Sequence, residues 1–194
     1  VFCALNCIRL ALSTYHVPRR EGEWPMKREN IKLLIFFVVT VLVGAGLHFL
    51  YEWSPNLLFA ILSPVRESVW EHLKLVFWPL LAALLLYTRK DKDQRAGWYL
   101  GLLTASALLL IYGWVYNIRM AQANMVVDIS AYVVIMALGF AVALWIPVAK
   151  RWKGILLLLA GILAALIVVF TFCPPNALLF ADLELADALY TLPC

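Results

Sequence analysis

Long apolar stretches alternate with short polar segments along most of the chain. Four of these stretches have 20 residues or more, and they are residues 31–53, 97–117, 125–149 and 154–173. A helix of about 20 apolar residues is long enough to cross the hydrocarbon layer of a bilayer. Each stretch is therefore predicted to form one transmembrane helix.

A fifth apolar stretch, residues 75–88, has only 14 residues without a formal charge and is too short to cross a bilayer as a straight helix. A helix of about 20 residues that ends at Thr88 has to begin near Val69. The predicted span 69–88 then submerges three ionisable side chains, which are Glu71, His72 and Lys74. Glu67 lies just before the start of this span, and a helix-bending proline, Pro79, lies near its middle.

The composition agrees with a membrane protein. The chain has 194 residues, of which 64% are hydrophobic and only 14% charged. Soluble domains are usually about 25% charged, so an ordinary soluble enzyme, a disordered chain and a disulfide-rich scaffold are all excluded. We expect one all-α domain over residues 26–173, a bundle of five transmembrane helices whose main partner is the lipid bilayer.

The basic residues predict how this bundle is oriented. Ten of them fall on one side, and they are Lys27, Arg28, Lys32, Arg89, Lys90, Lys92, Arg95, Lys150, Arg151 and Lys153. The opposite loops carry only Arg66 and Arg119. The positive-inside rule then places the N-terminus inside and the C-terminus outside, as in a bacterial inner membrane. The outer side is rich in acids, which should attract cations rather than nucleic acid.

Both ends of the chain differ from the bundle. Residues 1–25 lack the pattern of a signal peptide, and Met26 is a plausible start, so we interpret residues 1–25 as a non-native extension. Residues 174–194 mix leucines with acids and are predicted to lie outside, as an interfacial helix. Cys173 and Cys194 could pair in an oxidising compartment, although free thiols are the favoured interpretation.

Small residues indicate where the helices pack closely. Gly97 and Gly101 form a GxxxG pair on one predicted helix. Such a pair is either a contact within the bundle, which we favour, or a dimer face, and the oligomeric state stays open.

Polar residues gather toward the outer ends of three predicted helices. His48 and Glu52 are four residues apart and should share a helix face, and the acids and amine of residues 67–74 share another. Buried ionisable groups usually face the interior of a bundle and find partners there. A shared outward pocket would be lined by His48, Tyr51, Glu52, Glu67, Glu71, His72, Lys74, Asp128 and Tyr132.

Imidazole and carboxylate groups suit a divalent metal ion such as zinc, manganese or iron. The predicted metal ligands are His48, Glu52, Glu71, His72 and Asp128. Glu67 would guard the entrance, and Lys74 would set the charge state of Glu71. The leading hypothesis is an outward-facing pocket that binds a small cation or a metal ion, with transport as an extension.

Two other classes of function compete with this hypothesis. An intramembrane enzyme could use the same carboxylates and histidines on a lipid or lipid-linked substrate. A structural or partner-binding subunit would need no pocket, because Lys74 could neutralise Glu71 and the histidines could hydrogen-bond across helices. This last class predicts that His48, Glu71 and Lys74 are bonded to one another.

Three segments carry a family resemblance. They are HFLYEWSPN at 48–56, SPVRESVWEHLKLVFWP at 63–79 and FTFCPPNALLFAD at 170–182. Together they resemble a family of small bacterial polytopic membrane proteins that is classed as a domain of unknown function. The resemblance runs from about Met26 to Asp182 and implies no activity.

Overall fold

The computed structural model describes residues 28–122 and 124–182, with side chains from Ile31 onward. The chain divides into two compact units, residues 1–33 and 34–194. The first unit is described only from Arg28, where helix α2 begins. Residues 1–25, interpreted above as an extension, and residues 183–194 of the tail lie outside the described part of the chain.

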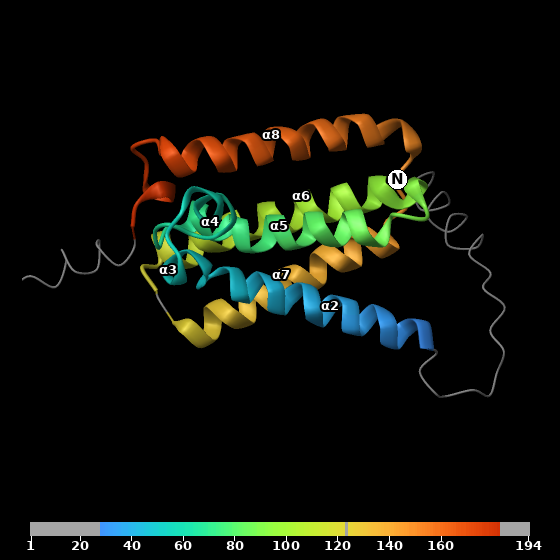
Figure 1. The fold of residues 1–194 in the computed structure, drawn as a ribbon, viewed down its shortest axis with the longest axis horizontal. Helices are drawn as coiled ribbons and strands as arrows, with labels where there is room; N and C mark the ends of the chain where they lie inside the picture. Colours follow the sequence, from blue (N-terminus) through green and yellow to red (C-terminus); the bar gives the residue numbers. More distant parts are fainter. Residues whose placement is uncertain (1–27, 123, 183–194) are drawn as a thin grey trace, which may run out of the picture. The chain divides into compact units, whose positions relative to one another are not determined.

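The described residues form helices and turns without any strand, so the all-α prediction is confirmed. In chain order the elements are α2 (Arg28–Leu47), α3 (Leu50–Trp53), α4 (Leu57–Leu62), α5 (Val69–Tyr87), η1 (Lys92–Gln94), α6 (Arg95–Tyr112), η2 (Gly113–Arg119), α7 (Met125–Trp145), η3 (Lys150–Trp152), α8 (Lys153–Phe172) and η4 (Leu178–Phe180). Figure 1 shows their arrangement.

Four helical segments within the described residues are long and apolar enough to cross a membrane. They are Val69–Tyr87, Lys92–Arg119, Met125–Trp145 and Lys150–Phe172. The described part of α2 with side chains, Ile31–Leu47, is also apolar but shorter.

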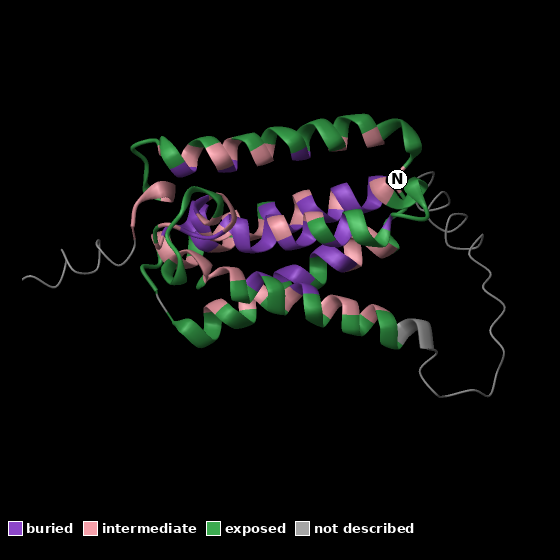
Figure 2. Cartoon of the chain, in the orientation of Figure 1, coloured by how far each residue is buried: buried purple, intermediate pink, exposed green. Residues whose placement is uncertain are grey.

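Helix α5 is the most buried element and forms the middle of the core (Figure 2). It packs against α6, which in turn packs along α7 and α8. Large side chains of α5, such as Leu73, Phe77 and Leu84, are almost completely enclosed. Many apolar side chains of α8 are exposed, as expected for a helix that faces lipid. The polar residues of α5 therefore meet protein rather than lipid.

Gly97 and Gly101 pack inside the bundle, as the GxxxG pair indicated. A Cβ atom at Gly97 would lie 2.7 Å from the carbonyl oxygen of Ala143, and one at Gly101 would meet the backbone of Gly139. Only glycine permits this approach of α6 to α7. The pair is an intramolecular contact.

The predicted helix 31–53 is divided in the structure. Helix α2 ends at Leu47, and the short helix α3 begins only at Leu50. Glycines in the last turn of a helix weaken it, and Gly44 and Gly46 lie there. The hydroxyl of Ser63 donates to the carbonyl oxygen of Leu47, which would have bonded the next helical turn. His48 and Glu52 consequently do not share a helix face.

The start of α5 agrees with the sequence prediction, whereas the end of α7 does not. Helix α5 begins at Val69, where the length argument placed it, because the side chain of Ser68 accepts a hydrogen bond from the backbone N–H of Glu71. Helix α7 ends at Trp145 rather than at residue 149. The next residue, Ile146, is extended because it precedes a proline.

Candidate metal centre

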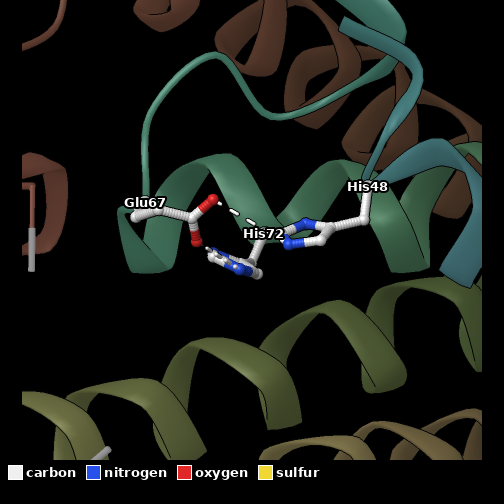
Figure 3. Close-up of side chains that lie close together, drawn as sticks. All are labelled: His48, Glu67 and His72. Carbon is white, nitrogen blue, oxygen red and sulfur yellow. Dashed lines mark ion pairs between the residues drawn. The ribbon is translucent and has the colours of Figure 1, made fainter. Parts of the chain in front are cut away.

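Three side chains meet near the start of α5, and they are His48, Glu67 and His72 (Figure 3). His72 Nε2 lies 3.3 Å from Glu67 Oε2. His48 Nε2 lies 3.9 Å from Glu67 Oε1. One ligand atom from each residue can be chosen so that all three lie within 4.8 Å of one another. These three residues are called the His48–Glu67–His72 cluster below.

Helix capping explains why Glu67 meets His72. Ser68 is the N-cap of α5, so Glu67 precedes the cap and His72 is the fourth residue of the helix. Side chains at these two positions regularly touch, and in most proteins the pair is apolar and is known as the hydrophobic staple. Here the same geometry brings a carboxylate against an imidazole.

The break after α2 supplies the third member. His48 lies in the turn that follows Leu47, where its ring faces His72 at a centroid distance of 5.4 Å. Ser63 holds this turn in place, since its hydroxyl donates to the carbonyl of Leu47 and accepts from the backbone N–H of Tyr51 at 3.2 Å. A continuous helix would have carried His48 in a different direction.

The ring of His72 is oriented by a backbone group. Its Nδ1 lies 2.8 Å from the carbonyl oxygen of Ser68, so Nδ1 carries a proton and donates to that carbonyl. Nε2 is then the atom directed at the cluster. Histidines that bind metals are typically fixed in this way, with the distal nitrogen bonded to a carbonyl or carboxylate.

The cluster is partly open to solvent and contains an ionised carboxylate. The side chains of His48, Glu67 and His72 are 30%, 35% and 32% exposed. The hydrogen bond from His72 holds the pKa of Glu67 below its ordinary value, with help from the charges of both imidazoles and against the effect of burial. The carboxylate is therefore ionised and accessible to a cation from solution.

The spacing suits a metal ion with nitrogen and oxygen ligands. Zinc binds such atoms at roughly 2.0–2.2 Å, so two ligands of a tetrahedral site lie roughly 3.3–3.5 Å apart. The 3.3 Å between His72 Nε2 and Glu67 Oε2 already matches this separation. His48 Nε2 lies 3.9 Å from the other carboxylate oxygen, Oε1, so His48 has to move closer before one ion can contact all three residues.

Glu71 and Lys74, both predicted to line the pocket, are instead tied to each other. Lys74 is fully buried, and its Nζ donates to Glu71 Oε2 at 2.6 Å, to Ala60 O at 2.7 Å and to Ser63 O at 3.1 Å. Glu71 Oε2 also accepts the backbone N–H of Val65 at 2.9 Å. All three ammonium protons are used, so this pair holds residues 60–65 against α5, and the charge of Glu71 is already balanced by Lys74.

The remaining predicted residues also lie outside the cluster. Glu52 is exposed on α3. Asp128 interacts electrostatically with His72, but its carboxylate accepts hydrogen bonds from Tyr112 Oη at 2.7 Å and Asn117 Nδ2 at 3.3 Å. Among the described residues, the predicted metal set is thus replaced by one in which Glu67 takes the place of Glu52, Glu71 and Asp128.

The two predicted tyrosines support the site rather than line it. Tyr132 Oη donates to the carbonyl oxygen of Val41 at 3.1 Å and lies 3.4 Å from that of Leu75. The Leu75 carbonyl lacks its usual helical donor because residue 79 is a proline. Tyr132 therefore joins α2, α5 and α7 beneath the cluster, while Tyr51 contributes its backbone N–H to Ser63.

Sequence reasoning treated Glu67 as the guard of an entrance and missed its place beside His72. The signal was present in residues 68–71, which read S-x-x-E, the capping-box pattern that begins a helix. This pattern predicts Ser68 as the N-cap of the helix. It therefore predicts that Glu67, just before the cap, lies beside His72, the fourth residue of the helix.

Comparison with known proteins adds a family but no activity. No curated protein and no solved structure matches the chain. A family model described as a family of unknown function (DUF6512) matches residues 24–187 and covers most of the chain. The match confirms the expected resemblance of residues 26–182 to a family of unknown function. The chain belongs to this family of unknown function.

Proposed function

We propose that this protein is a membrane protein that binds a divalent metal ion, with zinc the best fit, through His48, Glu67 and His72. The observation that carries the proposal is the meeting of two imidazoles and an ionised carboxylate from separate segments, at spacings that suit one ion. The Ser68 carbonyl behind His72 supplies the outer-shell contact that such a ligand needs.

The proposal places the cluster on the outer side of a bundle of five crossings, with α2 as the first. Two contacts support this orientation, because they bring the two basic loops together at the end of the helices remote from the cluster. Lys150 Nζ lies 2.6 Å from Asp93 Oδ2, and Lys153 Nζ donates to the carbonyl of Lys92 at 3.3 Å. By the positive-inside rule that end faces the cytoplasm of a bacterial cell.

Binding at the surface is better supported than transport through the bundle. A conducted ion would need polar groups deeper in the bundle than the cluster. The buried charged residues of α5 are Glu71 and Lys74. Lys74 uses all three of its donors on Glu71 and two backbone carbonyls, and its charge already balances that of Glu71. We therefore propose a bound ion rather than a conducted one.

An intramembrane hydrolase is the second candidate, and the number of ligands favours it. Structural zinc sites usually have four protein ligands, whereas catalytic sites have three and keep one position for water. The cluster has three, so a bound zinc would hold and activate a water molecule there. A lipid or lipid-linked ester that reaches the outer ends of the helices would be the substrate class.

Metal binding can be tested directly on tag-free protein in neutral detergent. After treatment with EDTA and removal of the chelator, calorimetric titration with Zn²⁺ should show one site per chain. His72→Ala and Glu67→Gln should each weaken binding at least about tenfold, since loss of outer-shell partners alone costs about 10–100-fold.

Glu52→Gln is the matched control, because it removes a nearby exposed carboxylate that is not part of the cluster. It should bind Zn²⁺ as the unaltered protein does. If all three variants bind equally well, or if the unaltered protein takes up no metal, the proposal is wrong.

A further inference from the structure

A second site lies beside the cluster, at the same end of α5. A cavity of about 460 Å³ opens between Arg66, in the loop before α5, and residues 174–181, which follow α8. Its lining includes two prolines, the side chain of Asn176 and the apolar side chains of Leu178 and Phe180. A volume of this size holds a small ligand or the headgroup of a larger one.

The segment 174–181 is built into the fold at this position. The ring of Phe180 packs against Trp70 of α5 at 5.0 Å and against Phe170 of α8 at 5.2 Å between centroids. Trp70 is almost fully buried. The wall opposite Arg66 is therefore held by aromatic contacts to two long helices.

Arg66 is a cation without a partner in the part of the chain that the structure describes. The acids nearest to it in sequence are engaged elsewhere, Glu67 with His72 and Glu71 with Lys74. Its guanidinium makes no hydrogen bond or ion pair with a described residue, and no carboxylate is among the residues that line the cavity. A guanidinium offers five N–H donors, so the cavity presents a positive charge with unused donors.

The surroundings of the cavity are apolar as well as positive. Leu178 is 62% exposed, and Phe172, at the end of α8, is 48% exposed. Both lie near the outer ends of helices that are apolar enough to cross a membrane. A ligand there would meet a cation at its polar end and aliphatic or aromatic surface beside it.

We propose that this cavity, called the Arg66 groove below, binds the phosphate of an anionic membrane lipid. The planar fork of arginine matches phosphate oxygens with two parallel hydrogen bonds. The exposed apolar residues beside the groove would contact the acyl chains. The inference does not depend on metal binding, since none of the residues that line the groove belongs to the cluster.

Lipid binding can be measured on the full chain in neutral detergent that contains EDTA, so that no metal contributes. Native mass spectrometry would follow titration with phosphatidylglycerol and, separately, with phosphatidylcholine. Phosphatidylglycerol should bind tightly enough to stay on the protein during transfer to the gas phase. Arg66→Gln should weaken this binding at least about tenfold, because it removes one charge-assisted bidentate contact. Arg66→Lys keeps the charge but not the planar fork, so its affinity for phosphatidylglycerol should lie between those of the unaltered protein and Arg66→Gln.

Two further variants make the result specific. Arg119→Gln removes the other basic residue predicted for the outer side. Arg119 is exposed at the end of η2, a segment that contacts η4. Arg119 itself does not line the groove. It should bind lipid normally. Ala177→Trp fills the groove without a change of charge and should weaken binding as Arg66→Gln does.

Three outcomes would overturn the inference. Equal retention of phosphatidylglycerol by the unaltered protein and Arg66→Gln would show that the arginine has no role. Equal losses in Arg66→Gln and Arg119→Gln would show general charge attraction instead of a site. If inorganic phosphate binds with the same dependence on Arg66 while phosphatidylglycerol does not, the groove is a site for a free anion rather than a lipid.

Discussion

The imidazole of His72 lies between two acceptors, the carbonyl oxygen of Ser68 at 2.8 Å from Nδ1 and the carboxylate of Glu67 at 3.3 Å from Nε2. Both nitrogens face oxygen atoms that accept hydrogen bonds, and this geometry favours a ring that carries both protons in the metal-free protein. A metal ion would have to replace the proton on Nε2, while the one on Nδ1 would stay on its bond to Ser68.

Zinc binding should therefore release protons. Ligands bind a metal only when deprotonated, and the proton on His72 Nε2 is the one that the geometry requires to leave. Titrations at constant pH in buffers of different ionisation enthalpy should give a release close to one proton per zinc near neutral pH. His72→Ala should release markedly less with any residual binding, and equal release by both proteins would contradict this assignment.

The stability of the metal-free protein should fall on acidification, in part through Glu67. Its pKa in the folded protein lies below the ordinary value of 4.5, because His72 donates a hydrogen bond to the carboxylate. Below about pH 4.5 the unfolded chain binds more protons than the folded one, so this contribution is present at higher pH and is lost as pH falls through the folded pKa.

Thermal unfolding in EDTA, followed from about pH 7 to below about pH 4, checks this sign. Glu67→Gln should lose less of its melting temperature over that range than the unaltered protein, whereas Glu52→Gln should behave like the unaltered protein. A Glu67→Gln profile as steep as that of the unaltered protein would show that the carboxylate gains nothing from His72.

The Lys74–Glu71 pair should contribute to stability, not to metal binding. Removal of one partner from a buried ion pair typically costs about 3–5 kcal/mol, because the other charge is left unpaired. Lys74→Met should therefore lower the melting temperature strongly, and Lys74→Met combined with Glu71→Gln should be less damaging than the sum of the single changes. An additive double variant would mean that the 2.6 Å contact contributes no coupling.

Gly44 is the point where α2 contacts α5 beside Leu75 and Pro79. A Cβ there would meet Tyr132 Oη, would lie 2.5 Å from Leu75 O and would lie 3.2 Å from Pro79 Cγ. Gly44→Ala should therefore destabilise the protein by about 1–3 kcal/mol, the usual cost of overpacking.

Gly46, two residues further on in α2, has nothing within 4 Å of the same position. Gly46→Ala should be neutral or stabilising by up to about 1 kcal/mol, since alanine favours a helix over glycine. Tyr132→Phe removes the closest atom and should reduce the penalty of Gly44→Ala. Equal melting temperatures for the two alanine variants would rule out close packing at Gly44.

Some features of the site were accessible from the sequence because they depend on local properties of the chain. The start of α5 near Val69 followed from the length that an apolar helix needs, and the pairing of Glu71 with Lys74 from their i, i+3 spacing. The all-α class and the apolar helices followed from long runs of apolar residues, which few other structures accommodate.

The membership of the metal cluster was decided only by tertiary structure. Helical periodicity put His48 and Glu52 on one face, but the helix ends at Leu47 because Ser63, distant in sequence, takes the last carbonyl. Periodicity also grouped Glu71 with the histidines. In the structure residues 60–65 pack against α5, where Val65 donates to Glu71 and Ala60 accepts from Lys74. Spacing along a chain predicts which side chains share a helix, and contacts between distant segments decide which of them remain free to bind.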